Sequence, residues 1–132
     1  YEISLGLVGS EMCIRDRATD EEKAARSAAI QEATKHAALV PMQVARNAYE
    51  LMAIITDVAR LGNRNAVTDA CVALMSARTA VLGALLNVRI NLGSIKDKVF
   101  ADDLQREADI LECQAREREK EVLDAINQEL RV

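Results

Sequence analysis

Two asparagines on one predicted helix are the residues whose type and spacing best suit chemistry. Asn87 and Asn91 lie four residues apart, which places both on one side of an α-helix. They continue a stripe of small residues that recurs at three- and four-residue spacing: Ala70, Ala73, Ala77, Ala80 and Ala84. Such a stripe predicts a buried surface in close contact with another helix. An unpaired buried amide costs about 1–3 kcal/mol, so the pair is a candidate for the polar rim of a pocket. Capping of a neighbouring helix terminus is the structural alternative.

A second polar cluster lies between two predicted helices. Residues 62–65 read Gly-Asn-Arg-Asn, and a threonine and Asp69 follow closely. Exposed main-chain amides at the start of a helix can bind an anion, and the side chains add amide and carboxylate groups. Ordinary loop and capping chemistry would use the same residues. Asn63 and Asp69 are the candidate binding residues here.

Other common chemistries lack the residues they need. His36 is the only histidine, and it has no companion in the spacing of a zinc site, so we expect no metal site and a surface position for it. The serines have no Gly-x-Ser-x-Gly context, and no glycine-rich phosphate loop is present. A catalytic residue therefore cannot be assigned from the residues alone.

The composition favours an all-helical protein. The 132 residues are 50% hydrophobic and 29% charged, with a net charge of −4. The acidic balance and an aromatic content of only 2% argue against nucleic-acid binding. One proline and five glycines supply too few turns for a many-stranded barrel or sandwich.

Four helical segments can be placed from their caps and periodicity. Thr19 and Glu22 form a capping box at the start of the first segment. Pro41 interrupts that helix, and a segment from 42 to 61 continues it, as one kinked helix or as two. The third segment covers about 66–92, with Thr68 or Asn65 as its cap and Gly93 as its stop, and the fourth covers about 98–130.

The apolar faces of these segments predict their packing. The third is apolar over much of its circumference and should be a central buried helix. The second carries an apolar pattern at Val44, Ala48, Leu51, Ile55 and Val58. The fourth has one narrow apolar face and should be a long antiparallel cover, burying Leu104, Ala108, Leu111, Ala115, Val122 and Ile126. The expected fold is an all-α antiparallel helical bundle.

The first seventeen residues are expected to be foreign to the domain. Residues 7–16 read LVGSEMCIRD, and their back-translation resembles a transposase-type sequencing adapter. A native strand is the alternative, because Ile3, Leu5 and Leu7 alternate. We therefore expect 1–17 to be adapter read-through and 18–132 to be the domain.

The rest of the chain suggests a cytoplasmic protein. Cys71 and Cys113 have no metal-binding spacing, which is typical of reduced thiols in the cytosol. We find no apolar run of the roughly 18–20 residues that a membrane span needs, so no membrane association is expected.

Three stretches, taken in order, resemble one enzyme family. They read RSAAIQEATKHAALVPMQVA, LGNRNAVTDACVALMSA and GALLNVRINLGSIKDKVF. The motifs within them are Val40-Pro41, Gly62-Asn63 with Thr68-Asp69, and the Asn87–Leu92 stretch, and the likeness covers residues 18–132. Together they resemble the formiminotetrahydrofolate cyclodeaminase and methenyltetrahydrofolate cyclohydrolase family.

The resemblance implies a homodimeric all-α domain with a folate pocket. Its members close 5-formiminotetrahydrofolate to 5,10-methenyltetrahydrofolate with loss of ammonia, or hydrolyse the methenyl bridge. Neither reaction needs a metal or a cofactor beyond the tetrahydrofolate substrate. By this resemblance Asn63, Asp69, Asn87 and Asn91 belong to the substrate pocket, and a formiminotransferase is a possible fused or associated partner.

The sequence departs from the family pattern at its start. Members carry a proline- and glycine-rich segment and then an aspartate-containing segment before the helix that begins here at Thr19, and their proposed catalytic aspartate lies in that upstream part. We therefore expect a bundle truncated at its N-terminal side and inactive alone. The deaminase is the first expectation, the cyclohydrolase the second, and a non-catalytic helical dimerisation module the third.

Overall fold

A computed structural model describes residues 19–131 of the chain. It contains the helices α2 (Asp20–Leu61), α3 (Val67–Leu92) and α4 (Lys98–Leu130), and a short 3-10 helix η1 (Arg64–Ala66). Within the described range there is no strand, so the all-α prediction is confirmed. The segment 1–17 and its predicted foreign origin lie outside the described residues. The described residues divide into two compact units, 19–33 and 34–131.

The first unit holds the start of α2 and its cap. The Thr19 main-chain N–H donates to Glu22 Oε2 over 2.8 Å, and the Glu22 N–H donates back to Thr19 Oγ1 over 3.3 Å. Acidic residues fill the first turn, where the positive end of the helix dipole favours negative charge. The predicted capping box is confirmed.

Helix α2 continues through its proline. Pro41 lies inside a single helix of 42 residues, so the interrupted pattern corresponds to one helix and not to two. A proline lacks one main-chain donor, but a long helix keeps its remaining hydrogen bonds on both sides of that position. Met42, the next residue, is fully buried.

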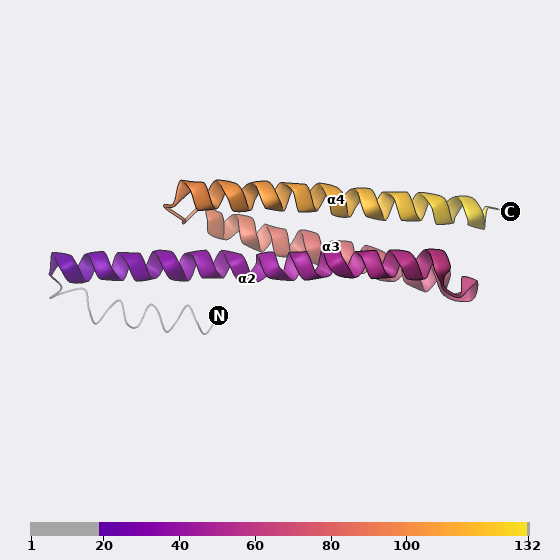
Figure 1. The fold of residues 1–132 in the computed structure, drawn as a ribbon, viewed down its shortest axis with the longest axis horizontal. Helices are drawn as coiled ribbons and strands as arrows, with labels where there is room; N and C mark the ends of the chain where they lie inside the picture. The colour runs from indigo at the N-terminus through magenta and orange to yellow at the C-terminus, as the bar shows by residue number, and fades with distance from the viewer. Residues whose placement is uncertain (1–18, 132) are drawn as a thin grey trace. The chain divides into compact units, whose positions relative to one another are not determined.

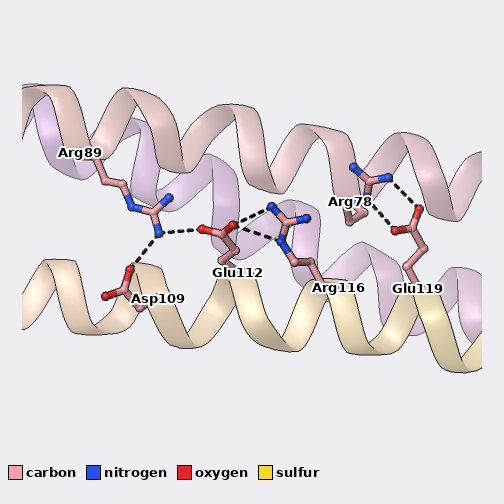
Figure 2. A network of polar contacts seen from close by, with 6 residues as sticks. All are labelled: Arg78, Arg89, Asp109, Glu112, Arg116 and Glu119. Carbon is pink, nitrogen blue, oxygen red and sulfur yellow. Dashed lines mark hydrogen bonds and ion pairs between the residues drawn. The ribbon is translucent and has the colours of Figure 1, made fainter.

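The second unit packs three helical segments side by side. On α3, Arg89 pairs with Asp109 and Glu112 of α4 at 2.8 and 2.7 Å, whereas Arg78, earlier on α3, pairs with Glu119, later on α4, at 2.7 Å (Figure 2). Helix α4 therefore runs antiparallel to α3, as predicted (Figure 1).

Helix α4 runs parallel to the part of α2 that lies in the same unit. Lys35 pairs with Asp97 near the start of α4, and Arg46 pairs with Glu107 further along it. The Arg118 guanidinium lies 4.6 Å from the centre of the Tyr49 ring. The order of the three helices is thus up, down and up, which is the expected antiparallel bundle.

Helix α3 contributes the most buried positions, but only one of its faces is covered. Leu74, Val81, Leu85 and Val88 are fully buried. Three members of the alanine stripe are buried as predicted, whereas Ala73 and Ala80 are exposed. Residues 73, 80 and 87 lie along one edge of the stripe, and the orientation of α3 about its axis turns that edge away from the core.

The predicted face of α4 is confirmed, whereas that of α2 is only partly correct, because Ala48 and Ile55 pack against the core and the other three residues do not. All six apolar residues predicted to be buried on α4 are buried. On α2, Val44, Leu51 and Val58 are exposed, and a neighbouring stripe is buried in their place: Ala38, Met42, Ala45, Met52, Thr56 and Ala59. Because α2 is apolar on both sides, its sequence could not decide which side meets α3 and α4.

Helix α3 also has the length and composition of a membrane span. Residues 64–92 contain an 18-residue window of mean hydropathy 1.6, of which 39% is buried. The expectation that no segment is long and apolar enough for a membrane span is therefore wrong. The same property belongs to core helices of soluble proteins, so this observation alone does not place the chain in a membrane.

The ion pair between α2 and α4 makes stability depend on pH. Arg46 donates to both carboxylate oxygens of Glu107, at 2.6 and 2.7 Å, and these hydrogen bonds lower the Glu107 pKa below its ordinary value of 4.5. The folded state therefore gains stability above the ordinary pKa and loses it as pH falls through the lower folded-state pKa. We expect the free energy of unfolding of Glu107→Gln to fall less steeply than that of the wild type as pH is lowered. Urea unfolding at a series of pH values measures this.

The control for this prediction is Glu50→Gln. Glu50 is exposed on α2, and the described residues give it no hydrogen bond or ion pair. Its variant should follow the wild-type pH profile. Identical profiles for Glu107→Gln and the wild type would contradict the stabilising role of the Arg46 pair.

Candidate functional site

The turn between α2 and α3 contains Asn63, and Asp69 follows it closely. A cavity lies at the same turn. The Gly62 N–H donates to the Val58 carbonyl oxygen over 2.9 Å, which ends α2. Asn63 then caps η1, because its Oδ1 accepts a hydrogen bond from the Asn65 main-chain N–H over 3.0 Å. The amide of Asn63 thus has a structural partner and remains exposed to solvent.

The cap of α3 differs from the prediction. The N-cap position is Ala66, which has no side-chain hydrogen bond, so neither Thr68 nor Asn65 caps this helix. The inserted 3-10 turn moved the capping side chain back to Asn63. Asp69 lies in the first turn of α3, is exposed, and has no hydrogen bond or ion pair within the described part of the chain. Its carboxylate is therefore available to a ligand.

The two asparagines near the end of α3 bind main-chain carbonyls. Asn87 Nδ2 donates to the Gly83 oxygen over 3.1 Å, and Asn91 Nδ2 donates to the Asn87 and Ala37 oxygens over 2.8 and 3.3 Å. Asn87 is exposed and Asn91 is half-buried, so the expectation that both amides are buried is wrong. Neither lines any of the cavities described for this chain.

The predicted site residues form two groups at opposite ends of α3. Asp69 and Asn87 are eighteen residues apart on one helix, which corresponds to about 27 Å at 1.5 Å per residue. A single copy of the chain therefore does not bring all four predicted residues into one pocket.

A cavity of about 360 Å³ lies at the α2–α3 turn. Its apolar wall includes Val67 of α3 and Val122 and Ile126 of α4. Arg60 and Arg64 provide its positive groups. This volume is within the roughly 300–1,000 Å³ that is usual for small-molecule pockets. We call this space, with Gly62 at its edge, the turn cavity.

The turn cavity contains residues that the sequence did not single out. Arg60, in the last turn of α2, and Glu129, near the end of α4, both line it. The two side chains line one cavity because α2 and α4 end at the same level, and no local sequence motif indicates this. The Gly-Asn-Arg-Asn cluster lies at the same turn, and its Gly62 and Arg64 line the cavity, whereas Asn63 and Asp69 do not.

The described residues offer no group of three or more histidines, cysteines, aspartates or glutamates that could hold a metal ion. His36 is exposed, as predicted. What the site provides is hydrogen-bonding amides, the exposed carboxylates of Asp69 and Glu129, and two guanidinium groups beside an apolar wall. These groups suit the binding of a polar organic molecule that also has an apolar part.

Comparison with known proteins decides the family. The family model described as formiminotransferase-cyclodeaminase matches residues 11–110. This chain belongs to the formiminotransferase-cyclodeaminase family. The match includes the turn cavity's α2 and α3 residues and all four predicted site residues.

Curated relatives carry two different activity names. A methenyltetrahydrofolate cyclohydrolase from Methylorubrum extorquens is 42% identical over 97 residues, which is 74% of this chain and 47% of that protein. A formimidoyltransferase-cyclodeaminase from Rattus norvegicus is 36% identical over 84 residues, covering 64% and 16% of the two chains. The Sus scrofa formimidoyltransferase-cyclodeaminase is 32% identical over 108 residues, covering 82% and 20%. The aligned part is thus about half of the cyclohydrolase and a fifth or less of the mammalian proteins.

Proposed function

We propose that this chain is part of a folate one-carbon enzyme that binds 5,10-methenyltetrahydrofolate. The observation that carries the proposal is membership of a family whose named relatives are a methenyltetrahydrofolate cyclohydrolase and formimidoyltransferase-cyclodeaminases. Methenyltetrahydrofolate is the substrate of the first reaction and the product of the second. One pocket for this compound would therefore serve either activity.

Hydrolysis of the methenyl bridge is the first candidate reaction. The cyclohydrolase relative has the higher identity and aligns over three quarters of this chain. In this reaction water adds to the carbon between N5 and N10, and the bond to N5 then breaks to leave 10-formyltetrahydrofolate. The proton-transfer group is not assigned to any residue of this chain.

Cyclodeamination is the second candidate, favoured by the family description and the mammalian relatives. Here N10 attacks the formimino carbon of 5-formiminotetrahydrofolate, and a general acid protonates the departing nitrogen, which leaves as ammonia. This reading also allows a formiminotransferase partner, because the two activities are named together in those relatives.

We assign the polar groups of α3, and Asn63 of the turn before it, to substrate binding. The unpaired carboxylate of Asp69 can accept hydrogen bonds from the N–H groups of a pterin, and the amides of Asn63 and Asn87 each keep an N–H that can donate to its oxygen and nitrogen atoms. Both N–H groups of Asn91 are used within the chain, so Asn91 offers its Oδ1 as an acceptor. We propose no metal or additional cofactor, since both reactions need only proton transfer and orientation of the folate.

The proposed pocket also needs a second copy of the chain. Two copies whose α3 helices pack antiparallel would bring Asp69 of one close to the asparagine pair of the other. Exposed apolar side chains support this homodimer, including Val72, Met75, Leu86 and Ile90 on α3. A cytoplasmic location is part of the proposal and fits the free thiols of Cys71 and Cys113 in the described part of the chain.

The binding of 5,10-methenyltetrahydrofolate to the full chain tests this function. We expect binding without turnover. Asp69→Asn should weaken binding about tenfold, since it removes the charged acceptor and keeps the shape. The measurement is equilibrium dialysis, read by the near-ultraviolet absorbance of the methenyl compound, with product analysis by chromatography.

The matched control is Asp102→Asn. Asp102 is an exposed aspartate on α4 that makes no hydrogen bond or ion pair in the described structure. It should bind like the wild type. Absence of binding by the wild-type chain, or equal binding by both variants, would contradict the assignment. Release of ammonia from 5-formiminotetrahydrofolate would instead refute the expected lack of turnover.

A further inference from the structure

The turn cavity combines an apolar wall with an arginine that has no partner among the residues the structure describes. Ala59, Val67, Val122 and Ile126 supply the wall. Arg60 lines the same space, and its guanidinium makes no hydrogen bond, ion pair or ring contact within the described residues. A guanidinium presents a planar fork of donors that matches the two oxygens of a carboxylate.

Most other arginines of the second unit already have a carboxylate. Arg46, Arg78 and Arg89 pair with acidic residues of α4 at 2.6 to 2.8 Å. Arg106 and Arg116 pair within α4 itself. The chain has 21 acidic residues for 17 basic ones, so carboxylates are plentiful. Arg60 thus has no carboxylate partner among the described residues, although the chain contains more acidic than basic residues.

The second guanidinium of the turn cavity is only weakly engaged. Arg64 lies 3.4 Å from Glu129, and the two side chains are 85% and 58% exposed. Exposed pairs of this kind contribute little to stability and exchange readily with other ions. A ligand carboxylate could therefore replace Glu129 at Arg64 while another oxygen pair binds Arg60.

We propose that the turn cavity binds the carboxylate end of a ligand whose adjoining part is apolar, with Arg60 as the anchoring cation and Arg64 as the second contact. If the proposed folate function holds, on which this identification of the ligand rests, the 4-aminobenzoylglutamate half of the folate is that end. It joins a flat ring, suited to the wall of Val67 and Val122, to two carboxylates. Asn63 and Asp69, which flank the same turn, would then be reached by the pterin half.

The test uses the full chain and 4-aminobenzoylglutamate as the probe, with its neutral diamide for comparison. Isothermal titration calorimetry should show that the diamide binds more weakly than the acid. Arg60→Gln should weaken binding of the acid about ten- to hundredfold and leave binding of the diamide unchanged. Glu129→Gln, which removes the competing carboxylate, should strengthen binding of the acid.

The control is Arg106→Gln, which removes the same charge from an exposed pair near the other end of α4. Its affinity for the probe should equal that of the wild type, and circular dichroism should show all variants folded. Equal affinities for Arg60→Gln and Arg106→Gln, equal binding of acid and diamide, or no binding of the probe at millimolar concentration would each overturn the proposal.

The experiment separates this proposal from the folate function. Arg60-dependent binding of the probe, with no binding of 5,10-methenyltetrahydrofolate, would support the carboxylate site and count against the function. Binding of the methenyl compound that is insensitive to Arg60→Gln would support the function and overturn the site.

Discussion

Leu85→Ala should lower the free energy of unfolding by about 2–5 kcal/mol. Leu85 is fully buried on α3 and belongs to the single core cluster formed with α2 and α4. Removing its branched end takes apolar surface out of the core and leaves a cavity that rigid neighbouring helices cannot fill. Urea unfolding followed by circular dichroism measures this loss.

A leucine outside the core provides the control. Leu61, the last residue of α2, is 84% exposed, so Leu61→Ala should change the free energy of unfolding by no more than about 0.5 kcal/mol. The two variants delete the same atoms. Equal losses would contradict the burial described above, because they would mean that Leu85 is no better packed than a surface leucine.

Gly62→Ala should destabilise the chain by about 1–3 kcal/mol. A Cβ atom at this position would clash with the Val58 carbonyl oxygen. That oxygen belongs to the main chain at the end of α2 and accepts the Gly62 N–H, so it cannot move without breaking the bond that ends the helix. The change should also disturb the edge of the turn cavity.

Gly83→Ala is the control, with an effect of opposite sign. Gly83 lies inside α3, and a Cβ atom there would meet nothing within 4 Å. Because alanine loses less main-chain freedom on helix formation, this variant should be more stable by about 0.5–1 kcal/mol. Thermal unfolding of both variants gives the comparison. A stabilised Gly62→Ala variant would show that the turn relaxes freely, against the contact described here.

The position of Gly62 connects stability with the candidate site. It ends α2, and the residues that follow form η1 and then α3, with Arg64 and Val67 lining the turn cavity. A shift of this turn would move Arg64 relative to Arg60. Binding lost in Gly62→Ala must therefore be separated from loss of folding, which circular dichroism of that variant under the binding conditions does.

Several features of the fold were determined by the sequence itself. The capping box of Thr19 and Glu22, the end of α3 at Gly93 and the buried face of α4 all agree with the structure. Caps involve residues no more than four positions apart, and α4 has only one apolar face. In such cases the local pattern has a single solution, and the rest of the chain does not change it.

Tertiary packing decided what the local pattern left open. Helix α2 has apolar residues on two sides, and contact with α3 and α4 selected the side that contains Met42 and Met52 and left Val44 exposed. The same contact turned Asn87 outward on α3. The turn cavity joins Arg60 to Glu129, which are 69 positions apart. A meeting over that distance depends on the lengths and register of three packed helices, which no short stretch of sequence contains.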